Sequence, residues 1–326
     1  MLRIALLNPS WSFISGDRTL HRYAELFTSK FCEKKLNYEE AKTYDGDVLL
    51  SFSGRPDLTG YCPPKEFKGM KIIHMQDHVF QAEESRRKLL ENKVDYVMCY
   101  NRHDKYDEFF KYAYPEYINK VIPVPFGYND LRFKQTIKFE DRLNKVIALG
   151  SVNPVNDPLC SEDIRQFVEF FKDEQWTHKW RRSLYVHSAD LTKEMDSLLP
   201  GFPITKDFNY DIVETYNKYK MFTSCESIMR YPSVKTFEGV ACGSVLVCSD
   251  HPCYDDIGFI DGVNCIKHKD NDIKDFQRVV RKYQQESELL KQIAETGKKH
   301  VEKNYNPQII ADRLYNKIHK LWTAQF

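Results

Sequence analysis

Short runs of apolar residues alternate along the chain with longer charged segments in which the apolar positions recur at helical spacing. Each run ends in a polar or glycine-containing turn. This alternation predicts parallel strands joined by crossover helices. In the first half, the expected strands are 3–8, 47–52, 71–75, 96–100 and 121–123, and the expected helices are 18–34, 82–92 and 105–111.

A second series of the same kind follows the charged stretch 134–145, which we interpret as a linker because it carries no strong strand or helix pattern. Its expected strands are 146–149, 184–187, 221–224, 245–249 and 265–267, and its expected helices are 163–173, 211–218, 234–241, 273–284 and 286–302. The final segment, 307–322, has an apolar stripe at helical spacing that needs a surface to pack on. The chain is therefore predicted to form two Rossmann-like, doubly wound α/β domains that face each other across a cleft.

The composition agrees with two domains and excludes several classes of protein. A chain of 326 residues is too long for one ordinary core and fits two domains of about 150 residues each. Its 48 basic and 47 acidic residues leave a net charge of +1, so any anionic ligand must be held by a local site. The apolar run 240–247 is far shorter than the roughly 20 residues of a membrane span, and the N-terminus lacks a signal-peptide pattern. We expect a cytoplasmic protein with no nucleic-acid partner, for which peripheral membrane contact stays open.

Several common catalytic motifs are absent from the sequence. There is no Gly-x-Gly-x-x-Gly turn after the first strands, no phosphate-binding P-loop, no Gly-x-Ser-x-Gly elbow and no His-Glu-x-x-His pair. Asp45 and Asp47 have the spacing of carboxylates in metal-binding sugar transferases, but they precede a strand, and we interpret them as a solvated turn. The nine cysteines form no paired framework and no zinc pattern, so they are expected to be reduced and buried. No metal site is expected.

The most informative segment is 225–250. Ser233, which follows a proline, is predicted to cap a short helix over 234–242, and Gly243 is predicted to end that helix before a strand. One face of this helix is apolar and is expected to pack in the core. The opposite face is then left for a ligand.

Lys235 in the first turn of this helix can join free backbone amides and the helix dipole in an anion site. Thr236 lies in the same turn and is included among the candidate donor-binding residues. Glu238 is three residues beyond Lys235 on the same side, and its carboxylate can accept two hydrogen bonds from a ribose diol. This combination suits a nucleoside diphosphate. The alternative is a Lys235–Glu238 salt bridge on an exposed face, and the spacing alone does not decide between them.

The segment 225–268 resembles the donor-site region of GT-B glycosyltransferases, and in particular the glycosyltransferase group 1 domain found in spore-maturation-type proteins. The pattern of that family runs roughly Pro-Ser-Lys-x-x-Glu-x-x-Ala-x-Gly, followed by a strand and an acidic Asp-Gly-x-Asn turn. This chain has Pro-Ser-Val-Lys-Thr-Phe-Glu-Gly-Val-Ala-Cys-Gly and, after a strand, Asp-Gly-Val-Asn. The similarity is clear from about residue 94 to the C-terminus and includes the closing helices.

The resemblance implies a GT-B fold, with 1–141 as an acceptor-binding domain and 142–306 as a nucleotide-sugar donor domain. It also implies that 307–326 returns as a helix to the first domain. Glu238 falls where the glutamate of the family holds the donor ribose, and Lys235 falls where its basic residue meets the diphosphate.

Further donor-side positions follow from the same resemblance. Gly150 and Ser151 follow the first strand of the second domain, where family members place backbone and a small residue against the diphosphate. His187 is expected to end the next strand and face the cleft, with a purely structural role as the alternative. Arg230 stands where retaining relatives carry a second glutamate. It can neutralise a leaving diphosphate without metal, or simply pair with Glu226, so retention or inversion at the sugar is left open.

The acceptor side is expected in the first domain. Asp77 and His78 follow a central strand, and either can serve as the general base that takes a proton from the acceptor hydroxyl. The alternative is that they cap the helix that begins near Gln81. Gly16 and Asp17 occupy the position of the glycine loop of the family, near acceptor and donor phosphate, although the usual double glycine is reduced here.

The sequence therefore predicts a glycosyltransferase that moves a sugar from a nucleotide-diphosphate sugar to a hydroxyl of a glycan or other acceptor. It is expected to need no metal and no cofactor besides the donor substrate. One alternative is a protein of the same fold that binds a nucleotide sugar or glycan without turnover, motivated by the missing second glutamate. A third is a nucleotide-sugar epimerase.

Overall fold

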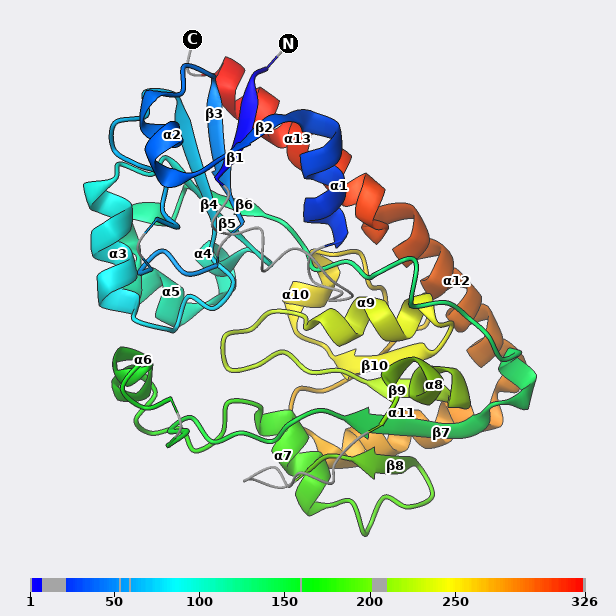
Figure 1. Cartoon of the computed structure of the whole chain (residues 1–326). Helices are drawn as coiled ribbons and strands as arrows, with labels where there is room; N and C mark the ends of the chain where they lie inside the picture. The colour runs from blue at the N-terminus through cyan, green and yellow to red at the C-terminus, as the bar shows by residue number, and fades with distance from the viewer. Residues whose placement is uncertain are drawn as a thin grey trace. The chain divides into compact units, whose positions relative to one another are not determined.

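The computed structural model describes residues 2–7, 22–52, 54–58, 60–158, 160–200 and 210–324. By its internal contacts the chain divides into two units, whose elements are labelled in Figure 1. Unit 1 comprises Met1–Phe126, Pro158–Lys172 and Pro307–Phe326, and unit 2 comprises Gly127–Asp157 and Asp173–Asn306. Unit 2 thus begins before the expected linker, and the segment 158–172 belongs to unit 1.

A six-stranded parallel sheet forms the centre of unit 1 (Figure 1). Its spatial order is β2-β1-β3-β4-β5-β6. The strands are β1 (Ile4–Leu7), β2 (Cys32–Leu36), β3 (Val48–Ser51), β4 (Met70–His74), β5 (Tyr96–Cys99) and β6 (Val121–Pro123). The four central strands are buried almost throughout, which explains why they appear as continuous apolar runs in the sequence.

All five strands expected in the first half are present, and β2 is an additional strand that the pattern did not predict. The sequence favours a helix as far as residue 34, but α1 (Arg22–Phe31) ends earlier and the chain continues directly into β2. The middle of β2 is charged and exposed, as is typical of a strand at the edge of a sheet. A strand without an apolar run leaves no clear periodicity to detect.

The other helices of unit 1 are α2 (Tyr38–Thr43), α3 (Ala82–Glu91), α4 (His103–Tyr106), α5 (Glu108–Ala113), the 3-10 helix η3 (Pro115–Tyr117), α6 (Arg165–Phe170) and α13 (Pro307–Thr323). The expected helix 105–111 is divided at Asp107. Its carboxylate accepts a hydrogen bond from the Phe110 backbone N–H at 3.0 Å, so Asp107 caps α5.

The apolar stripe of α13 packs within unit 1, where this helix runs beside α1 (Figure 1). The rings of Phe31 and Tyr315 stack with their centroids 4.3 Å apart. The Lys30 ammonium lies 2.8 Å from the Asp312 carboxylate. The last helix of the chain is therefore part of the same unit as the first.

A five-stranded parallel sheet forms the centre of unit 2 (Figure 1). Its strands are β7 (Leu143–Leu149), β8 (Met195–Leu198), β9 (Tyr219–Thr223), β10 (Val245–Ser249) and β11 (Ile266–His268), in the spatial order β11-β10-β9-β7-β8. The chain goes from β7 outward to β8 and then crosses back to β9 on the other side of β7. The order of the strands therefore reverses between β7 and β9.

The helices of unit 2 are the 3-10 helix η4 (Phe139–Asp141), α7 (Lys179–Val186), α8 (Ile212–Lys218), α9 (Val234–Ala241), α10 (Pro252–Asp255), α11 (Ile273–Gln285) and α12 (Ser287–Tyr305). One face of the sheet packs with α7 and α11 in a single apolar cluster that includes Val146, Trp180 and Phe276. The ring of Phe222, on β9, lies against Gly239 of α9. Helices thus contact both faces, as in a doubly wound sheet.

One strand prediction in the second half is wrong. Residues 184–187 lie in helix α7 and not in a strand, and the second strand of this sheet is instead β8. The apolar residues Leu184 to Val186 resemble a short strand in the sequence. In the structure, Leu184 is buried four residues after Trp180, at helical spacing, and Val186 is exposed. The other four strands and the helices α8, α9, α11 and α12 match the prediction to within a few residues.

All nine cysteines are free, and seven of them are buried. Asp45 and Asp47 form the turn predicted for them. Asp47 accepts a hydrogen bond from the Arg3 backbone N–H at 2.7 Å, and the Asp45 carboxylate accepts one from the Arg3 side chain at 2.6 Å. The turn anchors the start of β3 beside β1.

Candidate functional site

The candidate donor site lies in unit 2 where the strand order reverses. In open α/β sheets, ligands bind at the carboxyl ends of the strands on either side of such a reversal. β7 ends at Leu149 and leads into Gly150 and Ser151, whereas β9 ends at Thr223 and leads into Ser224. The predicted diphosphate loop therefore lies at the expected edge of the sheet.

Gly150 brings the backbone close to a buried arginine. Its φ of +119° lies in a region that side chains rarely adopt. A Cβ atom at this position would lie 3.1 Å from the Cζ atom of Arg181. The Arg181 guanidinium donates a hydrogen bond to the Ser151 carbonyl at 3.2 Å and is only 7% exposed. Glycine therefore allows this loop to pack directly against the guanidinium.

Hydroxyl groups join the start of α9 to the end of β9. Ser233 occupies the N-cap position, as predicted, but its hydroxyl makes no hydrogen bond to the backbone amides of the helix. It lies instead 2.9 Å from the Ser224 hydroxyl, which is also 3.1 Å from the Thr236 hydroxyl. Thr236 is fully buried, so its role in this state is to hold α9 in place.

Lys235 and Glu238 of α9 are not on an exposed face. Glu238 is 3% exposed, and Lys235 is partly buried. Burial and the neighbouring Arg181 lower the pKa of Lys235 to about 8, against the opposing effect of the Glu238 carboxylate. The ion pairs of the described residues do not include a Lys235–Glu238 pair, and Lys235 has no further contact of this kind. The alternative of an exposed salt bridge is therefore wrong.

His178 and Cys225 complete this part of unit 2. His178 precedes α7, and its Nδ1 atom lies 3.8 Å from the Cys225 sulfur. Burial and the charges of Arg181 and Lys235 hold the pKa of His178 well below its ordinary value, so the imidazole is neutral. Burial is the larger cause of this lowering, and the two cations act in the same direction.

Two cations therefore meet at this edge of the sheet without an acidic ion-pair partner among the described residues. Within the described residues, the Arg181 guanidinium hydrogen-bonds to a carbonyl oxygen and to no carboxylate, and Lys235 forms no ion pair. Buried charges are normally paired because desolvation of a lone charge is costly. Arg181, Lys235 and the Gly150 backbone are thus arranged to hold an anion, which we call the cation pair site.

Arg230 behaves differently from the cation pair. Its guanidinium lies 2.8 Å from the Asp270 carboxylate and 3.4 Å from that of Glu226. It has a positive φ of 57°, which is uncommon for a residue with a side chain. Glu226 is buried, accepts a hydrogen bond from the Ser249 hydroxyl at 2.8 Å, and has a pKa raised by burial. Of the two interpretations of Arg230, the structure shows the one in which its guanidinium pairs with neighbouring carboxylates.

His187 does not end a strand. It follows the last turn of α7, is exposed, and has only a distant contact with Asp190, with 3.7 Å between Nδ1 and Oδ2. The premise of the prediction was the strand over 184–187, which the structure replaces with a helix. No interaction among the described residues of unit 2 joins His187 to the cation pair site.

In unit 1, Asp77 and His78 follow β4 in very different environments. Asp77 is exposed, yet surrounding protein atoms raise its pKa, against the opposing effects of His78 and Arg55. His78 is only 2% exposed. Neither side chain caps α3, whose N-cap residue Gln81 has a φ of +44° and makes no side-chain capping bond. Of the two candidates, Asp77 has the side chain that an acceptor molecule can reach.

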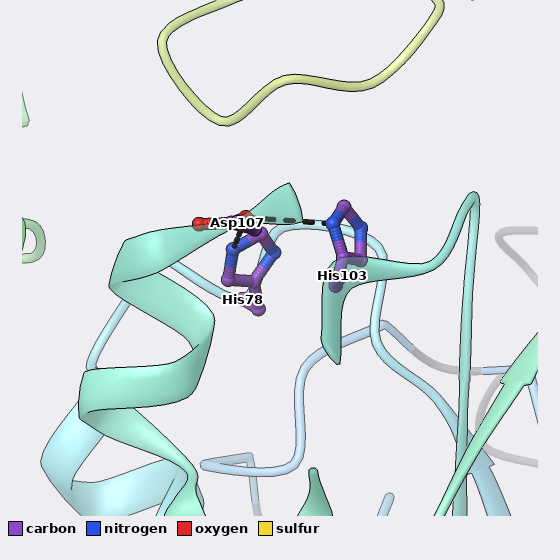
Figure 2. A group of neighbouring side chains, drawn as sticks. All are labelled: His78, His103 and Asp107. Atoms are coloured by element: carbon purple, nitrogen blue, oxygen red, sulfur yellow. Dashed lines mark ion pairs between the residues drawn. The ribbon is translucent and has the colours of Figure 1, made fainter. Parts of the chain in front are cut away.

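His78 belongs to a buried group with Asp107 and His103 (Figure 2). Its Nε2 atom is 2.8 Å from the Asp107 Oδ2 atom, and the His103 Nδ1 atom is 3.4 Å from the same oxygen. The two histidines hold the pKa of Asp107 well below its ordinary value in spite of burial, and burial lowers the pKa of His103. Gly16 and Asp17, the remaining acceptor-side candidates, lie outside the described residues.

Five residues of these groups were not predicted from the sequence: Arg181, His178 and Cys225 in unit 2, and Asp107 and His103 in unit 1. A basic run from Lys179 to Arg182 was visible, but the strand assigned to 184–187 concealed the helix that places it. The unit 1 group was detectable only by noticing that β4 and β5 are neighbours, so that the turns after them meet at one edge.

None of the described helices combines the length and the apolar character needed to cross a membrane. Residues 181–316 match the family described as glycosyl transferase-like. This region includes Arg181, Lys235 and Glu238. No curated protein sequence matches the chain.

Solved structures of similar fold cover nearly the whole chain. A sucrose-phosphate synthase from Thermosynechococcus elongatus is 11% identical with a TM-score of 0.56, over 99% of this chain and 100% of the other. HepE from Anabaena, in complex with UDP-glucose, is 8% identical with a TM-score of 0.57, over 98% of this chain and 100% of HepE. A glycosyltransferase from Rickettsia africae is 14% identical with a TM-score of 0.52, over 95% of this chain and 83% of the other. The chain therefore has the GT-B fold and carries, in residues 181–316, the sequence pattern of the glycosyl transferase-like family.

Proposed function

We propose that the protein transfers a sugar from a nucleoside diphosphate sugar to a hydroxyl group of a glycan or other acceptor. The observation that carries this proposal is the cation pair site, because two cations with no acidic ion-pair partner among the residues that the structure describes are compensated by a bound anion. A diphosphate supplies that charge at the sheet edge where this fold binds ligands. The match to the glycosyl transferase-like family supports the same reaction class.

In this mechanism, Arg181 and Lys235 bind the diphosphate and stabilise the charge that develops as it leaves. The bond between the anomeric carbon and the β-phosphate oxygen breaks, and its electron pair passes to that oxygen. Fixed cations in a desolvated site can supply this stabilisation without a metal ion. The Gly150 loop contributes close backbone approach, since no side chain separates it from the phosphates.

Glu238 would bind the ribose of the donor. Its carboxylate lies on the same helix as Lys235 and is 3% exposed, so it is a desolvated acceptor for the two ribose hydroxyls. Uridine is the first base to test, because HepE, a structure of similar fold, is in complex with UDP-glucose. The family resemblance described above assigns the same role to this glutamate.

Asp77 would act on the acceptor. Its carboxylate is exposed at the end of β4, and its raised pKa brings it closer to the range in which a general base works well. The acceptor oxygen forms the new bond to the anomeric carbon, and its proton passes to Asp77. His78, which is buried, would support the turn that carries Asp77.

The test is a panel of UDP, GDP and dTDP sugars, with release of the nucleoside diphosphate and product formation measured in the presence of hydroxyl acceptors. We expect one donor class to be turned over. Asp77→Asn should lower turnover at least about 100-fold while donor binding is retained, and Glu238→Gln should weaken donor binding. Turnover that is unaffected by Asp77→Asn would refute the assigned base.

A second function is favoured by one observation. Arg230 replaces a carboxylate expected near the donor sugar and is held by Glu226 and Asp270, so that position offers no free acidic group. Such a protein could bind a nucleotide sugar without transferring it. Tight binding of a donor with no product and no nucleotide release for any acceptor in the panel would favour this function over transfer.

A further inference from the structure

Three potential metal ligands from separate segments converge in unit 1. His78 follows β4, His103 begins α4, and Asp107 lies between α4 and α5. One ligand atom of each lies within 4.8 Å of the other two. Figure 2 shows both imidazoles directed at the same carboxylate, whose Oδ2 atom is 2.8 Å from His78 and 3.4 Å from His103.

This group is sealed from solvent. The exposed fractions of His78, His103 and Asp107 are 2%, 1% and 0%. Among the described residues, the Nδ1 atom of His78 has no hydrogen-bond partner, whereas its Nε2 atom pairs with the Oδ2 atom of Asp107. Buried polar atoms are almost always satisfied by a hydrogen bond, a water molecule or an ion. One buried imidazole nitrogen of this group is therefore left for a water molecule or an ion.

The surrounding residues hold the ligand atoms in position. Asp107 uses its other oxygen, Oδ1, to accept the Phe110 backbone N–H at 3.0 Å, which directs Oδ2 toward the histidines. The Tyr114 hydroxyl donates a hydrogen bond to the His78 carbonyl at 2.8 Å. The Phe110 ring lies 5.7 Å from the His78 ring and 5.9 Å from the His103 ring. These contacts fix the Asp107 carboxylate and the packing of both imidazole rings.

We propose that His78, His103 and Asp107 bind a divalent transition-metal ion, with Zn²⁺ as the best match. Two imidazoles and one carboxylate are a known set of three protein ligands for zinc, with a water molecule in the fourth position. Zinc bonds of about 2.0–2.1 Å in tetrahedral geometry place ligand atoms roughly 3.3 Å apart. Here the two distances from Oδ2 are 2.8 Å and 3.4 Å, and all three ligand atoms lie within 4.8 Å of one another. The divalent charge also compensates the buried carboxylate.

The role of this ion is structural. It connects the turn after β4 with the helices that follow β5, and thus fixes the segment that carries Asp77. Its three ligands belong to unit 1, whereas the residues of the cation pair site belong to unit 2. The proposal therefore does not depend on the proposed transfer reaction.

The first experiment uses the full chain and the metal alone. The protein is freed of metal with a chelator, and ZnCl₂ is titrated in competition with a chromophoric zinc indicator, with thermal unfolding followed in parallel. We expect about one Zn²⁺ per chain and a rise in Tm of at least about 4 °C, because an ion that binds only the folded state stabilises it. A chain that unfolds cooperatively but shows neither binding nor a Tm change would overturn the proposal.

Variants locate the ion. Asp107→Asn keeps a side-chain oxygen for the α5 cap but removes the anionic ligand, and His103→Gln removes an imidazole. The control is His74→Gln, which removes another fully buried histidine of unit 1 outside the group. We expect zinc affinity to fall at least about 100-fold in the first two variants and to stay within about threefold of the parent in the control.

Circular dichroism of the metal-free variants separates loss of the ion from loss of the fold. If Asp107→Asn and His103→Gln bind zinc as the parent does, the ion is held elsewhere and the site is wrong. If either variant fails to fold, the zinc affinity of the other variant and the zinc-dependent Tm of the parent decide whether the ion binds at this site. This readout is independent of nucleotide binding, so failure of the metal site and failure of the transferase proposal can be told apart.

Discussion

Unit 2 contains two groups of cations at the carboxyl edge of its sheet, and they differ in what balances them. Arg230 is held by two carboxylates, at 2.8 Å from Asp270 and 3.4 Å from Glu226. Arg181 and Lys235 have no acidic ion-pair partner among the described residues. A cation that the protein already neutralises stabilises the fold, whereas cations left without an ion-pair partner are available to an anionic ligand.

The two groups of cations also differ in how the surrounding protein shifts their pKa values. Burial lowers the pKa of Lys235 to about 8, so the folded protein maintains this charge against its own environment. The pKa of Arg230 is instead raised, because the Asp270 and Glu226 carboxylates outweigh its burial. We therefore expect substitutions in the two groups to have opposite signatures, one on ligand affinity and the other on stability.

The largest effect is expected for Arg181→Met. Loss of a buried, hydrogen-bonded charge partner commonly costs about 2–5 kcal/mol of binding free energy, and about 2.7 kcal/mol corresponds to 100-fold. We expect the Kd for the nucleoside diphosphate to rise at least about 100-fold, as measured by isothermal titration calorimetry. The matched control is Arg182→Met, since Arg182 is the next residue of α7 and its guanidinium stacks on Trp176. An equal loss in both variants would contradict a specific role for Arg181.

Lys235→Met should weaken nucleoside diphosphate binding by about tenfold to 30-fold. The effect is smaller than for Arg181 because an ammonium makes a point contact, whereas a guanidinium can bind phosphate in a bidentate manner. Lys235→Arg should restore part of the affinity. Unchanged affinity in the methionine variant would remove Lys235 from the site.

Arg230→Met should act on stability and not on binding. It leaves the buried Glu226 carboxylate without its guanidinium, and because Arg230 is one-third exposed we expect a loss of only about 1–2 kcal/mol in urea unfolding. The Kd for the diphosphate should stay within about threefold. The double variant Arg230→Met, Glu226→Gln should recover part of the stability, and a large loss of affinity in the single variant would erase the distinction between the two groups.

The smallest effect concerns pH. Below pH 8 Lys235 is protonated in the free protein, so diphosphate affinity should be full there and decline as the pH rises above 8. The stability of the free protein has the opposite sign. Between pH 8 and 10.5 the unfolded chain binds more protons at this lysine than the folded chain, so its contribution to stability increases with pH. In Lys235→Met, calorimetric titration should show no such decline in diphosphate affinity above pH 8, and urea unfolding should show no such rise in stability.

Local signals made α9 predictable. A proline and Ser233 mark its start, Gly243 with a φ of +77° follows its end, and Phe237 faces the core as the spacing indicates. The sheets were largely predictable as well, because buried parallel strands are continuous apolar runs. The exception is β2, where a charged edge strand has no such run.

The balance of charges was not predictable, because it depends on tertiary contacts. The spacing pointed to Glu226 as a partner of Arg230, but not to Asp270, which is 40 residues away and lies closer. It also gave no sign that Arg181 has no acidic ion-pair partner in the part of the chain that the structure describes. The group of His78, His103 and Asp107 was also not predictable from spacing, since it requires β4 and β5 to be neighbours in the sheet. Pairing of strands far apart in sequence brings these residues together.

The most direct test of the cation pair site compares a nucleoside diphosphate, the monophosphate and the free nucleoside by calorimetric titration of the parent and of Arg181→Met. We predict that the parent binds the diphosphate at least about 100-fold more tightly than the nucleoside, and that Arg181→Met loses most of this difference while its nucleoside affinity is unchanged. A diphosphate preference that survives intact in Arg181→Met would contradict the account.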